Sequence, residues 1–345
     1  MKKRFGIWLL ALAVFLPACQ KDGPGGETAA VKDLTVLFTP GHSFSGASYD
    51  DGILKVMAEC EAAWPNMELH LIRPEDARQA SSLIEAWKAG EGADKALILC
   101  GPTYESLVGE ASPGQGRILI VDSNKEFSGA ISTLQMKRYG GAWLAGALSK
   151  HLTLTIIKAY DGDRMMDTVA QGIEDGFLEA GGENCLHIVL SDGYEGTSMP
   201  DELFNILYAN PETYFQTNAC LVPVCGASRM GAYAFSNNYF VQSMGIGGDC
   251  SVYSDILPFS LINDLGTVLE DYIGQWLREE PWPAHRDFGL ATGHVSILYN
   301  QRFFELAPQR IFLQGSPYLL TLEEYKALEA QYMETALEKE ASHAY

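Results

Sequence analysis

Short apolar strands alternate with amphipathic helices along most of the chain, and this alternation limits the folds that it can adopt. Continuous apolar strands separated by helices are typical of parallel sheets that helices cover on both faces. The elements predicted in the first part of the pattern are strands at 33–39, 67–72, 95–100 and 117–122 and helices at 50–60 and 74–89.

The pattern starts again after a crossing segment at 131–135. The elements predicted in this second part are helices at 138–151, 165–180, 200–208 and 229–240 and strands at 152–158, 186–190, 220–224 and 243–248. Two such sets predict an α/β fold with two doubly wound parallel-sheet lobes, a hinge and a cleft between the lobes. Ligands of open parallel sheets bind beyond the carboxyl ends of the strands, so we expect the site in this cleft.

After Asp249 the chain is expected to cross between the lobes again. We predict an extended segment at 256–262, a helix at 264–278, a strand at 294–298 and a Glu-rich surface helix at 322–339. The expected division is lobe 1 at 33–133 and 255–286, lobe 2 at 134–254 and 287–316, and a C-terminal helix and tail at 317–345.

The N-terminus has the form of an export signal. Lys2, Lys3 and Arg4 precede an apolar run at 5–16 that is too short to span a hydrocarbon layer of about 30 Å comfortably. This pattern predicts a signal peptide that is removed from the mature protein.

The end of that run resembles a bacterial lipobox. Leu16-Pro17-Ala18-Cys19 has the order in which Cys19 is lipidated and becomes the first residue, so 1–18 would be the signal. The polar, Gly-rich stretch 19–32 is expected to be a flexible tether. The resemblance implies a lipid-anchored protein of the bacterial cell envelope, on the periplasmic face or the outer surface. A plain secretory peptide is the alternative.

The charge of the chain excludes one class of partner. The net charge is −20, and loss of Lys2, Lys3 and Arg4 takes the mature chain to −23. Such a surface repels phosphate backbones, so we expect no nucleic-acid partner.

Cofactor and metal motifs are absent from the sequence. It contains no Walker, His-Glu-x-x-His or EF-hand pattern, and Cys220-x4-Cys225 has no second pair or nearby His. We therefore expect no cofactor and no metal site. The six cysteines that follow Cys19 could form disulfides in an oxidising compartment or remain buried thiols.

Three groups of residues, in order along the chain, resemble the basic membrane protein family, the nucleoside-binding lipoproteins of bacterial ABC importers. They are Ser43-Phe44 with Tyr49, then Gly141-Ala142-Trp143-Leu144-Ala145-Gly146, and then Ile246-Gly247-Gly248-Asp249 with Ile256-Leu257 and Asn263. The resemblance implies a fold like that of type I periplasmic binding proteins. It also implies a receptor that closes on a small polar ligand, nucleoside-like or sugar-like, and serves an ABC permease and ATPase.

The chain departs from that family at three positions. The family's Asn after Ser-Phe is Ser45, its Lys before Asn is Ile262, and its Gly-rich stretch after the seventh strand is 225–229. Of the family's ligand contacts, only Phe44 and Asp249 match residue by residue.

Polar and aromatic residues at the expected strand ends are the candidate ligand contacts. Phe44 could stack on a planar ligand face, carboxylates could accept hydrogen bonds from ligand hydroxyls, and Arg229 could bind a carboxylate or phosphate. Each of them could instead be a structural cap or a solvated side chain. The candidates are Phe44, Ser45, Asp122, Tyr160, Asp161, Arg229 and Asp249.

Two other functions stay open beside the binding protein, which we expect to have no enzymatic activity. The stretch 41–46 resembles a Gly-x-Ser-x-Gly nucleophile elbow around Ser43, with His187 or His294 as a base, but Ser45 stands where the turn needs Gly. An exported α/β hydrolase is therefore one alternative. The other is a surface lipoprotein with a receptor-like fold that binds a glycan or a protein.

Overall fold

A computed structural model describes residues 31–40, 49–90, 94–111, 116–214, 218–306 and 319–344. The predictions for the signal, for Cys19 and for Phe44 and Ser45 lie outside these residues. So does the tether, except for its last two residues, of which Lys32 already begins a strand. Within the described ranges, no helix combines the length and the apolar composition needed to span a bilayer.

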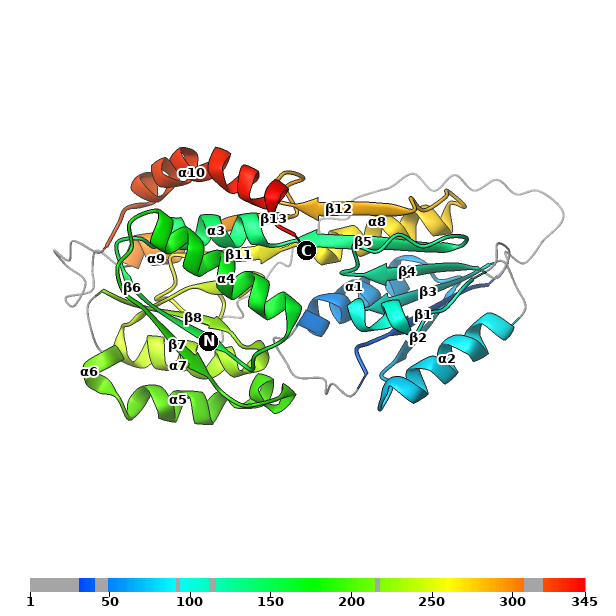
Figure 1. Ribbon diagram of the computed structural model, residues 1–345, viewed down its shortest axis with the longest axis horizontal. Helices are drawn as coiled ribbons and strands as arrows, with labels where there is room; N and C mark the ends of the chain where they lie inside the picture. The colour runs from blue at the N-terminus through cyan, green and yellow to red at the C-terminus, as the bar shows by residue number, and fades with distance from the viewer. Residues whose placement is uncertain are drawn as a thin grey trace, which may run out of the picture. The chain divides into compact units, whose positions relative to one another are not determined.

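Six parallel strands form the first sheet, in the order β12-β5-β4-β3-β1-β2 (Figure 1). They are β1 (Lys32–Leu37), β2 (Met67–Ile72), β3 (Lys95–Cys100), β4 (Arg117–Val121), β5 (Ile131–Lys137) and β12 (His285–Gly289). The helices of this part are α1 (Tyr49–Ala63), α2 (Ala77–Ala89), η1 (Pro102–Ser106) and α8 (Leu265–Leu277). We call this part lobe 1.

Both faces of the first sheet are buried. In β3, Ala96 and Ile98 belong to the cluster that includes α1 and α8, whereas Leu97 and Leu99 pack with Ile84 of α2. Alternate side chains of a strand point to opposite faces, so a strand between two helical layers needs apolar residues at every position. The continuous apolar strands follow from this requirement.

The second sheet consists of two strand groups joined by one interrupted strand. The groups have the orders β7-β6-β8-β9 and β10-β11-β13, and all neighbours are parallel except β11 and β13. Only Met244 separates β9 from β10, so this strand pairs with β8 in its first half and with β11 in its second. The strands are β6 (Thr153–Lys158), β7 (Cys185–Val189), β8 (Ala219–Val224), β9 (Gln242–Ser243), β10 (Gly245–Gly247), β11 (Phe259–Asn263) and β13 (Val295–Tyr299).

Helices again cover both faces of this second part, which we call lobe 2 (Figure 1). Side chains of α3, α4 and α10 join the cluster on one face, and those of α5 and α7 join the cluster on the other. The helices are α3 (Tyr139–Leu148), α4 (Arg164–Glu179), η2 (Tyr194–Ser198), α5 (Pro200–Tyr208), α6 (Pro211–Tyr214), η3 (Gly226–Ser228), α7 (Arg229–Tyr239), α9 (Gln301–Leu306) and α10 (Leu322–Ser342). The predicted fold class, α/β with two doubly wound parallel-sheet lobes, is confirmed.

The chain passes between the sheets at three places: from β5 to α3, from β11 to α8, and from β12 to β13. This pairing differs from the division expected from the sequence. We expected 255–286 in lobe 1, but β11 pairs with β10 and β13, and the passage falls at Asp264. The segment 134–137 and the unpredicted strand β12 extend the first sheet instead. An apolar run does not reveal which of two buried sheets it joins.

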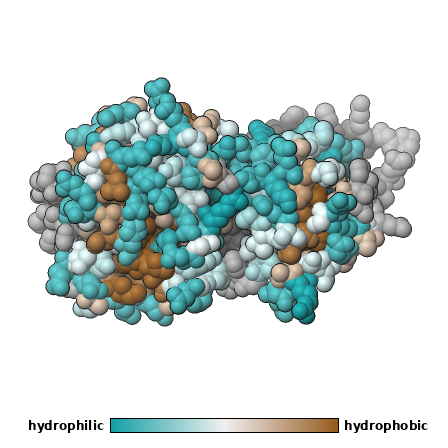
Figure 2. All heavy atoms as spheres, viewed as in Figure 1, coloured by the Kyte–Doolittle hydropathy of each residue, from teal (hydrophilic) through white to brown (hydrophobic). Residues whose placement is uncertain are grey.

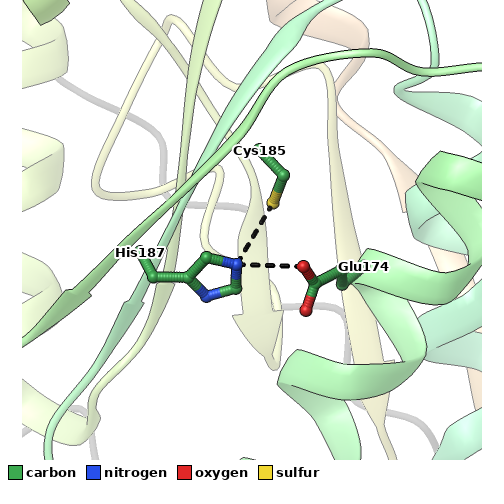
Figure 3. A group of neighbouring side chains, drawn as sticks. All are labelled: Glu174, Cys185 and His187. Carbon is green, nitrogen blue, oxygen red and sulfur yellow. Dashed lines mark hydrogen bonds and ion pairs between the residues drawn. The ribbon is translucent and has the colours of Figure 1, made fainter.

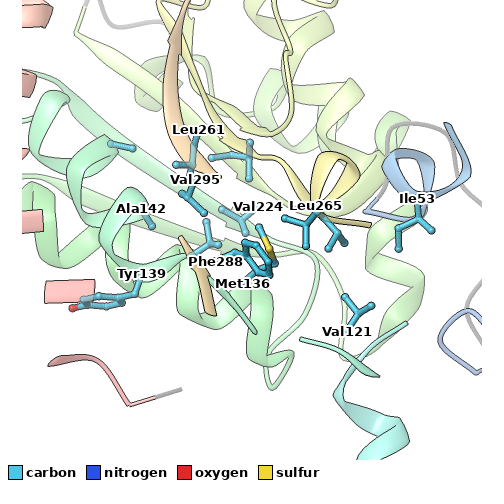
Figure 4. Packing of buried hydrophobic residues seen from close by; sticks show 14 of the residues in the cluster. Ile53, Val121, Met136, Tyr139, Ala142, Val224, Leu261, Leu265, Phe288 and Val295 are labelled. Carbon is cyan, nitrogen blue, oxygen red and sulfur yellow. The ribbon is translucent and has the colours of Figure 1, made fainter. Parts of the chain in front are cut away.

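An apolar cluster extends through these passages. Figure 4 shows Met136 of β5, Phe288 of β12, Leu261 of β11 and Val295 of β13 among its members. All four side chains are at most 3% exposed. The connections between the sheets are therefore part of a core.

Glycines let helix α3 pack closely on its neighbours. A Cβ on Gly141 would lie 2.3 Å from Val295 Cγ1, so at this point the helix lies against the sheet. Two further glycines bring α3 against α4, because a Cβ on Gly146 would lie 1.9 Å from Ile173 O and one on Gly176 1.8 Å from Trp143 O. Helix backbones can approach this closely only where no side chain intervenes.

Helix α10 packs on α3, as expected for a surface helix, but its Glu-rich sequence is not wholly solvated. Thr321 and Glu324 form a capping box at its start. Near its end Glu340 is only 4% exposed, and its carboxylate accepts hydrogen bonds from the backbone N–H groups of Leu290 (2.8 Å) and Ala291 (3.2 Å). These residues belong to the third passage between the sheets. Glu340 therefore connects the end of α10 to this passage.

Hydrophobic residues gather on one part of the surface in Figure 2, over the region where β7 and α5 lie in Figure 1. The exposed hydrophobic side chains of these two elements are Leu186, Val189, Ile206 and Tyr208. Strand β7 is at the edge of its sheet, which explains why its outer side chains are less covered than those of β6.

Candidate functional site

The loops after the parallel strands carry most of the predicted ligand contacts, as expected. Asp122 follows β4, Tyr160 and Asp161 follow β6, Arg229 follows β8 and η3, and Asp249 follows β10. The structure gives each of them a different environment.

Asp122 forms a buried ion pair with Arg138. Arg138 Nη1 lies 2.6 Å from Asp122 Oδ1 and Nη2 lies 2.9 Å from Oδ2, and the two side chains are 7% and 2% exposed. The backbone N–H of Met136 also donates to Oδ1, at 3.3 Å. Both oxygens of the Asp122 carboxylate are thus bound within the protein.

Arg138 also contacts a second passage between the sheets. In the amide orientation that satisfies both side chains, Asn263 Oδ1 accepts from Arg138 Nε at 2.7 Å and from Nη2 at 3.1 Å. Arg138 stands where the chain leaves β5 for α3, and Asn263 ends β11 before α8. The Arg138 guanidinium therefore connects the passage from β5 to α3 with the passage from β11 to α8 and with the end of β4.

Sequence reasoning assigned Asp122 to the ligand and missed Arg138. The available signal was a single arginine between an apolar strand and an apolar helix, because such a position is buried and a buried guanidinium needs an acidic partner. The sequence does not show which carboxylate supplies that partner.

Tyr160 and Asp161 belong to a loop that prepares the start of α4. Asp163 caps this helix, accepting from the backbone N–H groups of Met165 and Met166 at 2.9 Å each. The Tyr160 hydroxyl donates to Asp163 Oδ2 at 3.1 Å, and burial together with this carboxylate raises the pKa of Tyr160. Asp161 is exposed and pairs with Lys158. Tyr160 and Asp161 thus bind side chains close to them in the sequence, as expected if their role is structural.

Arg229 and Asp249 both lie near the end of β10. Arg229 Nη1 donates to the carbonyl of Ile246 at 2.6 Å, while its buried Nε has no hydrogen-bond partner among the described residues. Asp249 is exposed, and its Oδ1 accepts from the backbone N–H of Ser251 at 3.0 Å. Arg229 is therefore fixed beside the end of β10 and keeps an unused donor.

A small cavity lies between residues of both lobes. Its volume is about 10 Å³, and its polar lining includes Gln135 of β5 and Arg164 of α4. Gln135 Oε1 and Arg164 Nη2 are buried and make no hydrogen bond in the part of the chain that the structure describes. The remaining lining residues are Pro102, Asp122, Met136, Arg138, Met165 and Thr168.

The cavity brings together only one of the predicted contacts, Asp122. Tyr160, Asp161, Arg229 and Asp249 are not among its lining residues. Sequence reasoning missed Gln135 and Arg164, although both flank predicted elements on the carboxyl side of the sheets. A larger hollow of about 420 Å³, lined in part by Asn237, Ser251 and Arg302, lies beside the loop that continues from Asp249.

The residues of the hydrolase alternative are not brought together by any described contact. Ser43 lies outside the described residues. His187 Nε2 lies 3.0 Å from Glu174 Oε1, and His294 Nδ1 lies 3.0 Å from the Thr292 hydroxyl. Neither of these two contacts involves a serine.

Buried thiols account for several of the cysteines. Cys60, Cys220, Cys225 and Cys250 are buried as free thiols. Burial raises the pKa of the Cys220 thiol to about 12, which makes it unreactive.

Known structures share this fold at low sequence identity. No family model matches the chain, and no curated protein matches its sequence. An ABC transporter solute-binding protein from Aeropyrum pernix K1 is similar over 90% of each chain, with a TM-score of 0.63 and 13% identity. A transcriptional activator of the comK gene from Bacillus halodurans is similar over 88% of this chain and 96% of that chain, with a TM-score of 0.61 and 10% identity.

A third similar structure contains a sugar. It is a periplasmic solute-binding protein of an ABC transporter from Actinobacillus succinogenes 130z with bound D-allose. It matches 79% of this chain and 99% of its own, with a TM-score of 0.54 and 14% identity. The chain therefore has the α/β fold found in periplasmic solute-binding proteins.

Proposed function

We propose that the protein is a solute-binding protein that captures a small polar ligand between its two lobes for an ABC importer. The observation that carries this proposal is a pair of polar groups, Gln135 Oε1 and Arg164 Nη2, that lack a hydrogen bond to any described residue and lie in a cavity lined by both lobes. An acceptor and a donor without partners are costly inside a protein unless something binds them. The fold supports the same function.

A ligand with several hydroxyl groups suits this lining best. A hydroxyl can donate to Gln135 Oε1 and accept from Arg164 Nη2, which a purely anionic or cationic group cannot do. Solved structures of this fold contain α-D-tagatopyranose, D-allose and allitol. A sugar or polyol is therefore our first candidate, and the match of Phe44 and Asp249 to the basic membrane protein family keeps a nucleoside as the second.

Binding would require the lobes to separate first. The cavity of about 10 Å³ holds no more than about one water molecule, whereas pockets for small ligands are about 300 Å³ or larger. A ligand that touches Gln135 and Arg164 would then favour the closed arrangement, because it gains contacts with both lobes only there.

A lipid anchor on Cys19 is part of the proposal. The sequence order at 16–19 supports it, and the protein would then work at the bacterial cell envelope. Metabolic labelling with a palmitate analogue should label the wild-type protein and leave C19S unlabelled. Labelling of both proteins, or of neither, would remove the anchor from the proposal without touching the binding function.

A thermal-shift screen tests ligand binding. The mature protein is screened against sugars and polyols, nucleosides, and amino acids. A ligand at about 100 times its Kd stabilises the folded protein by about 2.7 kcal/mol, which raises the Tm measurably. Q135A and R164Q should lose the shift, whereas R302Q should keep it, because the Arg302 side chain is 68% exposed and does not line this cavity. If no class shifts the Tm of a folded protein, the proposal is wrong.

The nearly filled cavity favours one second candidate. A receptor-like surface protein that binds a glycan or another protein on its outside would not need room between the lobes. One structure of this fold is titled a transcriptional activator, so the fold alone does not fix transport. This candidate would be supported if the protein bound glycans on an array, or a protein partner, and if Q135A and R164Q left that binding unchanged.

A further inference from the structure

Three potential metal ligands lie together at the edge of the second sheet. Cys185 and His187 are two positions apart on the edge strand β7, so their side chains point to the same face. Glu174 comes from α4, on the same face of the sheet. Figure 3 shows the three side chains turned toward one another.

The distances suit a small tetrahedral metal ion. His187 Nε2 lies 3.7 Å from Cys185 Sγ and 3.0 Å from Glu174 Oε1, and all three ligand atoms lie within 4.8 Å of one another. Zinc binds sulfur, nitrogen and oxygen at about 2.0–2.3 Å, so tetrahedral ligand atoms are about 3.3–3.6 Å apart. Shifts of about 1 Å or less in flexible side chains would bring the three atoms to these separations around one ion.

We propose that Glu174, Cys185 and His187 form a Zn²⁺ site with three protein ligands and one open position. This site is separate from the cavity that we propose for the polar solute. None of its residues lines that cavity.

The chemistry of the three groups favours zinc over calcium or magnesium. Thiolate and imidazole are ligands of zinc and other borderline or soft ions, whereas calcium and magnesium bind oxygen almost alone. One thiolate and one carboxylate also supply two negative charges, which balance those of the ion. Glu174 and Cys185 are half-buried and His187 is exposed, so an ion from solution can reach them.

Without metal, the thiol is held in its protonated form. Burial, followed by the charge of Glu174, raises the pKa of Cys185 to about 12. A bound cation reverses this preference, because it coordinates the thiolate and releases the proton. The three ligand atoms lie close together whatever the protonation state of the thiol.

The chain offers a matched control on the other sheet. His70 lies on β2, an edge strand of the first sheet, with Glu68 Oε1 at 3.6 Å and Asp33 Oδ1 at 3.7 Å from its Nε2. Its side chain is 42% exposed, compared with 45% for His187. This cluster has an imidazole and carboxylates but no sulfur, so H70Q controls for weak binding of zinc to exposed histidines.

The experiment measures Zn²⁺ binding by competition with a chromophoric chelator. The proteins compared are the mature wild type, E174Q, C185S, H187Q and H70Q, each reduced and freed of metal. We expect one equivalent of Zn²⁺ to bind the wild type and H70Q with equal affinity. Removing one ligand should weaken binding by more than the roughly 10- to 100-fold that loss of an outer-shell partner costs.

Cobalt gives a second readout that a merely structural effect would not change. Co²⁺ in place of Zn²⁺ should give a thiolate charge-transfer band in the wild type and H70Q, and C185S should lack it even if it still binds cobalt. Circular dichroism of each metal-free variant shows that it is folded. The proposal is wrong if all five proteins bind zinc with equal affinity, or if only H70Q binds it more weakly. It is also wrong if the cobalt complex of the wild type lacks the charge-transfer band. A failed solute screen would leave these outcomes unchanged.

Discussion

The ion pair between Arg138 and Asp122 should be a main determinant of the stability of the passages between the sheets. Replacing Arg138 by Met keeps a similar volume but removes every donor that the Asp122 carboxylate and Asn263 receive from it. The carboxylate is only 2% exposed and would lose the charge of Arg138.

The expected loss follows from this burial. Two unit charges 4 Å apart attract by about 4 kcal/mol at the effective dielectric constant of about 20 that fits proteins. Desolvation offsets much of this gain in the wild type, but removing one partner leaves the other unpaired. We therefore expect R138M to lose about 3–5 kcal/mol of unfolding free energy.

Urea unfolding at neutral pH, followed by circular dichroism, measures this loss. R302M is the control, because the pair of Arg302 with Asp255 is 68% and 33% exposed and should contribute no more than about 1 kcal/mol. The double variant D122N/R138M should recover at least about 1 kcal/mol relative to R138M, since it removes the unpaired charge and Asn tolerates the positive φ of 59° at this position. If R138M loses no more than R302M, the buried pair does not stabilise the fold and our reasoning fails.

Three further predictions concern helices. G176A should lose at least about 1–3 kcal/mol of unfolding free energy, because its Cβ would lie 1.8 Å from Trp143 O. G52A, in α1, should instead gain about 0.5–1 kcal/mol, because open space surrounds this glycine. Equal urea midpoints for the two variants would contradict this prediction. D163A should lose about 1 kcal/mol in the same assay through loss of the α4 cap, and D163N should recover most of it; a D163N variant as weak as D163A would argue against capping. Burial raises the pKa of Glu340 above its usual 4.5, so its stabilisation is complete below that pH and is lost as the pH rises through the folded pKa. The stability of the wild type relative to E340Q should therefore fall as the pH increases above about 4.5, and a difference that stays constant or grows would refute this sign.

Much of the fold follows from residues that are close in the sequence. The apolar runs of β3 and β4 and the capped helix α2 were predicted within a few residues of their observed bounds. Strand β12 was missed because His285, Arg286 and Asp287 are polar, which an edge strand beside the passages tolerates. The sheet to which β11 belongs depends on long-range pairing, which no local pattern records.

The candidate site was less predictable because its groups come from distant parts of the chain. Strand ends located Asp122 and Arg229 correctly after β4 and β8, but the partners of these side chains are 16 and 17 residues away. Cys185 and His187 stand two residues apart in the sequence, but the predicted strand at 186–190 included only His187. Glu174 joins them only because α4 packs against β7, and this long-range contact completes the set of three potential metal ligands.

The bond from Glu340 to the third passage between the sheets has a consequence for experiments. Helix α10 is attached to lobe 2 through α3, and its last turn holds the amides of Leu290 and Ala291. Any separation of the two lobes would therefore have to move α10 together with this passage or break its hydrogen bonds to Leu290 and Ala291. If the lobes open as proposed, purification tags appended to the C-terminus, or clipping of the final residues by proteases, should alter how readily they open, and so the affinity that a binding assay reports.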